Sequence, residues 1–217
     1  MKKFMKVVLV EWKLNNRNFS NLFFALVFPV MMIMLFGTIY GNEPSEFMGG
    51  YGAVDVLVSG NICMIIGITG LTILPLTLSQ YRERKILKRF MITPIKPVEL
   101  LCSQLIVNTI ATIVGMTLLL FVAKIVFNLN FFGNIFYALV SFIIILLSIF
   151  TIGLFIAGVS KNTKAATAIS YIVYFPMLFL SGATVPFEAM PDSITILSKL
   201  LPLTYGVRLL KGVWLGG

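Results

Sequence analysis

Five long apolar stretches decide what this chain of 217 residues can fold into. Each stretch runs for 19 to 29 residues with no Asp, Glu, Lys or Arg inside it, and a helix needs about 20 residues to cross a bilayer. They are residues 22–40, 56–78, 100–123, 131–159 and 165–186. Backbone polar groups in hydrocarbon must be satisfied within the segment, so the stretches predict helices. We therefore expect an all-α polytopic membrane protein that forms a single transmembrane domain over residues 1–217.

The composition supports a lipid environment and excludes several functional classes. Hydrophobic residues make up 59% of the chain and charged residues 12%, whereas a soluble domain has about 25% charged residues. There is no His, and Cys63 and Cys102 are the only Cys residues, so we expect neither a metal site nor a disulfide framework. The net charge of +9 is spread over short segments between the apolar stretches. That distribution is typical of loops beside a lipid bilayer and predicts no nucleic-acid partner.

Segments rich and poor in Lys and Arg alternate along the chain. The rich segments hold Lys2, Lys3, Lys6, Lys13 and Arg17 at the start, Arg82, Arg84, Lys85, Lys88, Arg89 and Lys96 in the second loop, and Lys161 and Lys164 in the fourth. The first loop holds none, and the third holds only Lys124. The positive-inside rule then places the N-terminus in the cytoplasm of a multi-pass protein of the cell membrane. The long basic start, with no cleavage site after the first stretch, argues against a signal peptide.

The first 20 residues predict a helix of their own. Phe4, Val8 and Trp12 are spaced four apart, while Lys6 and Lys13 fall on other faces. This spacing is typical of a helix over residues 2–20 that lies in the headgroup layer. The alternative is an ordinary basic flank that only fixes the topology.

The second loop, residues 80–99, predicts a short amphipathic helix over residues 81–93. Ile86, Leu87, Phe90 and Met91 form an apolar stripe among basic residues. The helix should stop at residues 93–94, because Pro disfavours helical conformation in the residue before it. Its stripe can dock into a groove on a partner protein, or the loop can contact only anionic lipid. The spacing does not choose between the two.

Two further features concern the path through the membrane. Pro176 should kink the fifth span, and the chain after it, residues 181–205, predicts short re-entrant or surface helices on the outer face. One of these helices should run from 192 to 201 and another should begin near Thr204. The polar residues inside the spans are either a substrate path or interhelical hydrogen-bond partners. They are Asn61, Thr69 and Thr72 in the second span and Asn108 and Thr112 in the third.

Three groups of residues along the chain form a recognisable pattern. They are Glu11, Arg17, Pro29, Phe36 and Gly37; then Arg82, Glu83, Leu87, Arg89, Thr93, Pro94 and Glu99; then Pro176, Phe179, Leu180, Ser181, Gly182, Pro186, Met190, Pro191, Pro202, Leu203 and Tyr205. Over essentially the whole chain, this pattern resembles the permease subunits of type-2 ABC exporters. The chain departs from the family at Lys85, where glycine is usual, and at Ile86, where threonine is usual. These departures leave the start of the second-loop helix open.

The resemblance implies an architecture and a set of site residues. Family members have an N-terminal elbow helix, a cytoplasmic coupling helix that docks on the ATPase, and an outer motif after the fifth span. They have six spans, of which five are visible here. The coupling-helix residues would be Arg82, Glu83, Leu87, Arg89, Phe90, Thr93 and Pro94, and the outer-gate motif Pro176, Ser181, Gly182, Pro186, Met190 and Pro191. The family also pairs two permease subunits, identical or different, over two ATPases.

The expected function is that of a transport subunit with no ATPase site of its own. The phosphate-binding pattern Gly-x-x-x-x-Gly-Lys-Ser/Thr is absent, so ATP and Mg²⁺ are expected on the partner. No ionisable residue lies inside a span, which argues against a proton antiporter. We expect export of a hydrophobic or amphipathic cargo, such as a drug, an antimicrobial peptide or a lipid-linked glycan. The alternatives are a bacteriocin immunity exporter and a membrane scaffold that transports nothing.

Overall fold

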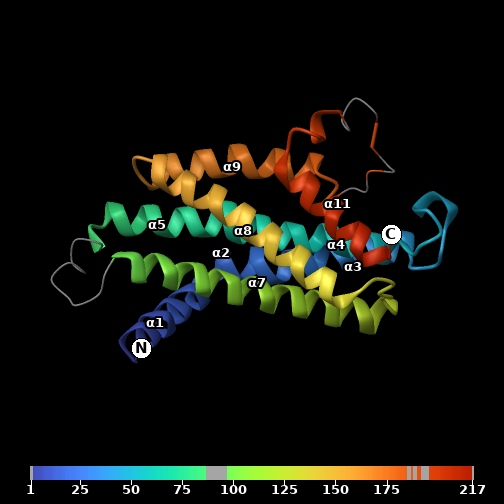
Figure 1. The fold of residues 1–217 in the computed structure, drawn as a ribbon, viewed down its shortest axis with the longest axis horizontal. Helices are drawn as coiled ribbons and strands as arrows, with labels where there is room; N and C mark the ends of the chain where they lie inside the picture. Colours follow the sequence, from blue (N-terminus) through green and yellow to red (C-terminus); the bar gives the residue numbers. More distant parts are fainter. Residues whose placement is uncertain (1, 87–96, 185–186, 188–189, 192–195, 217) are drawn as a thin grey trace.

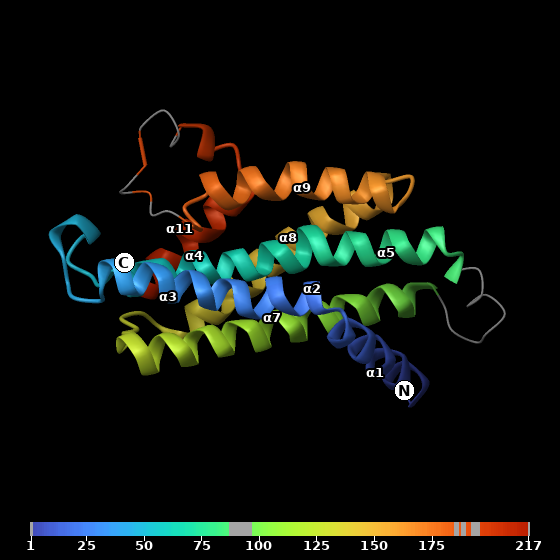
Figure 2. The ribbon, with the colours of Figure 1, turned by 180° about the vertical axis from the view of Figure 1, so that it is seen from behind.

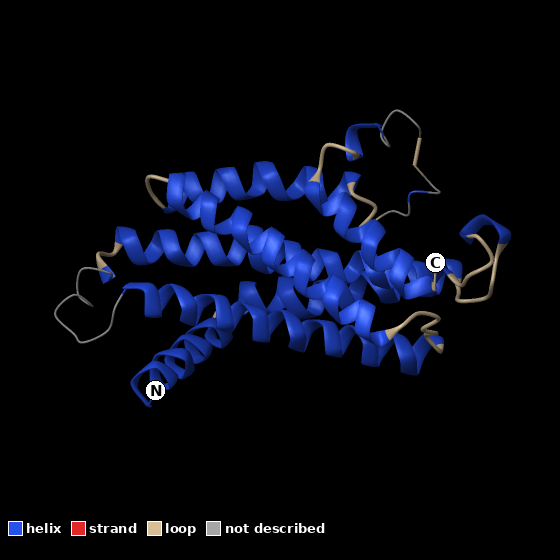
Figure 3. Ribbon diagram, viewed as in Figure 1, coloured by secondary structure: helices blue, strands red, loops and turns tan. Residues whose placement is uncertain are grey.

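The computed structural model describes residues 2–86, 97–184, 187, 190–191 and 196–216. Every regular element within these ranges is a helix (Figure 3). Five of the helical segments are long and apolar enough to cross a membrane. This confirms the prediction of an all-α protein with five transmembrane helices.

Several of the spans are built from more than one helical piece. The first span joins α2 (Phe19–Leu22), the π-helical η1 (Phe23–Val27) and α3 (Phe28–Tyr40); the second joins α4 (Ala53–Gly67), the π-helical η3 (Ile68–Ile73) and α5 (Leu74–Glu83); α7 (Pro97–Phe127), α8 (Ile135–Val159) and α9 (Thr163–Leu180) are the third, fourth and fifth. Outside the spans lie α1 (Lys2–Arg17), the 3₁₀ turn η2 (Glu46–Met48) and α11 (Pro202–Leu215). The helix predicted over residues 2–20 is therefore present as α1, while its position in a headgroup layer stays a prediction.

The second span forms the centre of the bundle (Figures 1 and 2). In its most apolar 18-residue window 83% of the residues are buried, against 22–44% in the other four spans. Its side chains pack against α3, α7, α8 and α11. We call the end of the bundle that carries α1, the end of α5 and the α8–α9 turn the α1 end, and the opposite end, with α11, the α11 end.

The two π-helical segments share one local cause. Each is followed by a proline at the second position of the next α-helix, Pro29 after η1 and Pro75 after η3. Proline lacks an N–H and its ring clashes with the carbonyl four residues earlier. Shifting to the wider π pattern relieves this clash. In the residue before each proline, the N–H donates to the carbonyl five residues back, from Phe28 to Phe23 and from Leu74 to Thr69.

Glycines in neighbouring spans fit against these widened backbones. A Cβ on Gly115 of α7 would lie 2.7 Å from the carbonyl oxygen of Ala25 in η1. A Cβ on Gly153 of α8 would overlap the carbonyl oxygen of Gly70 in η3. The two π-helical segments therefore sit in direct backbone contact with the third and fourth spans.

The chain after the fifth span differs in detail from the sequence-based expectation. The fifth helix ends at Leu180 rather than at residue 186, because Ser181 caps it and Gly182 turns the backbone at φ +82°. The helix continues through Pro176 without ending there. The helix predicted to begin near Thr204 is present as α11, which begins two residues earlier at Pro202, and this start fits the preference of proline for the first helical position. Of the helix predicted over residues 192–201, the first four residues lie outside the described ranges.

Candidate functional site

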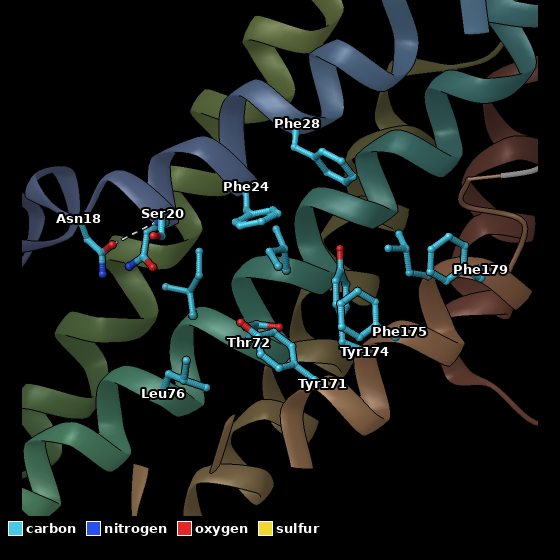
Figure 4. Close-up of a pocket in the computed structure, with 14 residues that line it drawn as sticks. Asn18, Ser20, Phe24, Phe28, Thr72, Leu76, Tyr171, Tyr174, Phe175 and Phe179 are labelled. Carbon is cyan, nitrogen blue, oxygen red and sulfur yellow. Dashed lines mark hydrogen bonds between the residues drawn. The ribbon is translucent and has the colours of Figure 1, made fainter. Parts of the chain in front are cut away.

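A cavity of about 380 Å³ opens between the first, second and fifth spans (Figure 4). Phe24 and Phe28 of the first span approach it from one side, and Tyr171, Tyr174 and Phe175 of α9 approach it from the other. The lining is Asn18, Ser20, Asn21, Phe24, Phe28, Ile68, Thr72, Ile73, Leu76, Tyr171, Tyr174, Phe175, Leu178 and Phe179. This volume and this concentration of aromatic side chains are typical of a pocket for a small apolar or aromatic molecule.

Polar groups are few in this cavity, and no described residue that lines it is charged. Asn18, Ser20 and Asn21 stand near the start of the first span, where Asn18 Oδ1 accepts a hydrogen bond from Asn21 N at 3.4 Å. Deeper in the cavity, the buried Thr72 Oγ1 has no hydrogen-bond partner within the part of the chain that is described. An unpaired buried hydroxyl is costly, and this oxygen is almost completely covered by the surrounding side chains and backbone.

The cavity lies beside both π-helical segments. Phe24 belongs to η1, and Ile68, Thr72 and Ile73 belong to η3. π-helical bulges occur frequently at functional sites. The widened backbone of each span therefore determines where these lining side chains point.

The other four polar residues predicted as a candidate substrate path contact protein. Thr69 and Thr112 pair across the second and third spans, with their hydroxyl oxygens 2.9 Å apart. The amides of Asn61 and Asn108 donate to backbone carbonyls one turn earlier in their own helices, those of Leu57 and Gln104. Among these five residues, the cavity is lined by Thr72 alone. A role in a substrate path stays a prediction for all five.

Arg82 and Glu83, predicted as coupling-helix residues, lie in the last turn of α5 at the α1 end. The Arg82 guanidinium donates to the carbonyl oxygens of Ala157 at 3.0 Å and Gly158 at 3.4 Å, and also to that of Ser160. The Glu83 carboxylate accepts the backbone N–H of Thr163 at 2.9 Å. Within one helical turn, the two side chains therefore reach the end of α8 and the beginning of α9.

Tyr81, one residue earlier, joins a second cluster at the same end. Its hydroxyl donates to Glu11 Oε2 of α1 at 2.5 Å, and Gln104 Nε2 of α7 donates to the same oxygen at 2.6 Å. Glu11 is buried. Burial raises the pKa of the Glu11 carboxyl above its ordinary value, and the two hydrogen bonds oppose that rise. The cluster links α1, α5 and α7.

The chain changes direction just after α5. Arg84 caps the helix, and Lys85 takes the left-handed conformation with φ +55°. Glycine adopts this conformation at little cost, whereas a residue with a side chain is strained. This explains physically why a glycine suits that position. The remaining predicted coupling-helix residues, Leu87, Arg89, Phe90, Thr93 and Pro94, lie outside the described ranges.

The described residues of the predicted outer-gate motif lie at the end of α9 and in the chain that follows it. Ser181 N–H donates to Met177 O at 3.2 Å, and Met190 N–H donates to Phe187 O at 3.1 Å. A Cβ on Gly182 would overlap the Phe187 ring, over which the Arg208 guanidinium lies at 4.9 Å. Of the remaining motif residues, Pro176 lies inside α9, Pro191 follows Met190, and Pro186 is outside the described ranges. A gating role for the motif stays a prediction.

Sequence reasoning missed the aromatic residues of the cavity and the contacts of Tyr81. Tyr171, Tyr174 and Phe175 recur at helical spacing, which places them on one face of the fifth span. That signal was present, but aromatic residues are also common where spans face lipid. Tyr81 carried no local signal, because its partners are distant in sequence. Glu11 lies 70 residues before Tyr81, and Gln104 lies 23 residues after it.

Comparisons with known proteins agree with this architecture. The family model described as "ABC-2 type transporter" matches residues 3–215. The chain is 27% identical over 182 residues to "ABC transporter G family member 20" of Dictyostelium discoideum, a match covering 83% of this chain and 24% of that protein. It is 22% identical over 165 residues to "Inner membrane transport permease YhhJ" of Escherichia coli (strain K12), covering 75% and 42%. The chain thus spans less than half the length of these relatives. No solved structure matches it significantly.

Proposed function

This chain belongs to the ABC-2 type transporter family, and from that premise we propose that it is the permease subunit of an ATP-driven exporter. It works with an ABC ATPase that binds ATP and Mg²⁺, a function for which these 217 residues carry no phosphate-binding loop. A second permease subunit completes the membrane part. The protein lies in the cell membrane with its α1 end in the cytoplasm, as the distribution of Lys and Arg indicates.

The cavity between the first, second and fifth spans carries the proposal for the cargo. Its walls are aromatic and aliphatic, and none of its described lining residues is charged. Such walls favour a hydrophobic or amphipathic molecule over a bare ion, which would lose its hydration without compensation. Asn18, Ser20 and Asn21, which line the cavity near the start of the first span, supply hydrogen-bonding groups for a polar atom of the cargo.

The test is reconstitution of the chain with its ATPase in vesicles. The probe is an uncharged fluorescent dye with a fused aromatic ring system and one hydroxyl group. The dye should stimulate ATP hydrolysis and move across the membrane only when ATP is present. Phe175→Ala should weaken dye stimulation, because it removes a ring from the cavity. Phe155→Ala is the matched control, since Phe155 is exposed on α8 outside the cavity lining.

Three outcomes would count against the proposal. If no ATPase co-purifies with the chain in mild detergent, the chain is not the permease of an ABC exporter. If the ATPase binds but Phe155→Ala and Phe175→Ala affect stimulation equally, the cavity is not the cargo site. Assembly without dye movement would favour a membrane scaffold.

A further inference from the structure

We infer that the last turn of α5 is a transmission element, in which Arg82 and Glu83 act as positioning residues that hold the α8–α9 turn. In this assignment a displacement of the α1 end of α5 carries the ends of α8 and α9 with it. The two residues then act inside the chain and do not form the contact with the ATPase. The inference rests on the proposed function, because the ATPase supplies the displacement.

The contacts of Arg82 match the electrostatics of a helix end. The last four carbonyls of a helix have no partner within the helix and carry partial negative charge. Arg82 donates to two carbonyls in the last turn of α8 and to that of its capping residue, Ser160. A planar guanidinium with five N–H donors can serve several acceptors at once. One side chain from α5 thus holds the end of the fourth span.

Glu83 accepts a hydrogen bond at the beginning of the fifth span, whereas Arg82 donates at the end of the fourth. The first N–H groups of a helix are unpaired and carry partial positive charge. The Glu83 carboxylate accepts the N–H of Thr163, the first residue of α9, while Asn162 caps the same helix through Ala165 N–H at 2.8 Å. A basic and an acidic residue in direct succession therefore complement the negative end of α8 and the positive start of α9.

The neighbouring Tyr81 extends the connection to the other side of α5. Through Glu11 and Gln104 it joins α1 and α7. Three consecutive residues of α5 thus contact four other helices at the α1 end, where these helix ends gather (Figure 2). Arg84, the next residue, is exposed and makes no hydrogen bond to α8 or α9 that the structure describes. The described contacts to the other helices are therefore made by Tyr81, Arg82 and Glu83, the three residues before Arg84.

The first experiment measures the contact itself by hydrogen exchange in the nucleotide-free chain. Glu83→Ala and Arg82→Ala should speed amide exchange in residues 157–165 by about fivefold, roughly the factor for the loss of one net hydrogen bond. Arg84→Ala is the matched control and should leave exchange there unchanged. Because Arg82 and Glu83 are exposed, these variants should keep the folded spans. Unchanged exchange in both variants would overturn the inference.

The second experiment uses the complex with its ATPase, trapped with ADP and vanadate. In the wild type and in Arg84→Ala, trapping should change exchange in residues 157–165. In Arg82→Ala and Glu83→Ala the ATPase should still bind and hydrolyse ATP, but trapping should no longer affect those residues. A retained response would overturn the inference, and so would loss of assembly in these two variants alone, which would assign them to docking. Failure of the wild type to bind any ATPase would instead remove the proposed function, and this inference with it.

Discussion

Replacing Gly153 with Ala tests whether the π-helical backbone of the second span and the fourth span are packed as closely as the structure shows. A Cβ at Gly153 would overlap the carbonyl oxygen of Gly70 and lie 2.9 Å from its carbon. Both are backbone atoms, so no side-chain rotation can make room. The variant can only be accommodated if α8 and η3 move apart.

The expected magnitude follows from two opposing effects. The Cβ would lie 1.9 Å from that oxygen, so restoring ordinary contact requires a separation of about 1.5 Å. A gap of that size forfeits about half or more of the dispersion attraction between the facing atoms. Overpacking of a tight core costs about 1–3 kcal/mol, and a clash between two backbones should reach the upper end. Ala also gains about 1 kcal/mol over Gly in a helix. Gly153→Ala should therefore destabilise the protein by about 2 kcal/mol.

The control is Gly158→Ala in the same helix. A Cβ there meets no atom within 4 Å, so only the helix propensity acts, and this variant should gain about 1 kcal/mol. The two variants should therefore differ by about 3 kcal/mol in the free energy of unfolding. The assay is equilibrium unfolding in mixed micelles, followed by far-ultraviolet circular dichroism. Equal stability of the two variants would refute the close contact between Gly153 and Gly70.

Three further predictions follow from contacts elsewhere. Lys85→Gly should raise the free energy of unfolding by about 1 kcal/mol in the same assay, because glycine relieves the left-handed conformation; a loss of stability would contradict it. Thr69→Val and Thr112→Val should show an interaction energy of about 0.6 kcal/mol in a double-mutant cycle, since their hydroxyls pair across two spans; additive effects would exclude the pair. Burial raises the pKa of Glu11, so the folded state holds that proton more tightly than the unfolded state, and stability present below the unfolded pKa is lost as pH rises through the folded pKa. The melting temperature of Glu11→Gln minus that of the wild type should increase as pH rises from 4 to 8. A difference that stays constant over this range would contradict the pKa shift.

The spans could be predicted from the sequence because lipid imposes one dominant requirement. A backbone in hydrocarbon has to satisfy its own polar groups, so a long uncharged stretch can only be a helix or part of a closed barrel. Local chemistry then set several boundaries. The fifth helix stops where Ser181 and Gly182 occur, and α11 starts at Pro202. Hydropathy nevertheless predicts one span over residues 165–186, because it does not register the left-handed conformation of Gly182, after which the helix does not continue.

The cavity was harder to predict, because its aromatic lining has the same composition as a lipid-facing surface. Tyr174 is 3% exposed, whereas Phe179, five residues later, is 54% exposed, although both line the cavity. Hydropathy treats two such residues almost alike. The prolines carry a further signal, because π-helical bonding precedes both Pro29 and Pro75, whereas α9 continues as an α-helix through Pro176. Both π-helical segments lie beside the cavity, so proline positions inside spans point to sites that polar residues alone do not reveal.

Arg82 and Arg84 show why counting charges cannot assign roles within the second loop. Both contribute equally to the positive-inside signal, and both are exposed. Arg82 nevertheless donates to the carbonyl end of α8, while Arg84 is the capping residue of its own helix and has no described hydrogen bond to α8 or α9. The difference arises because side chains two residues apart on a helix point in directions about 200° apart, and only one direction faces the α8–α9 turn. A basic residue immediately followed by an acidic one at the end of a span is therefore better interpreted through the two helix ends it can reach. Net charge says how the loop is oriented, whereas the order of the charges, Arg before Glu, matches the end of α8 and the start of α9.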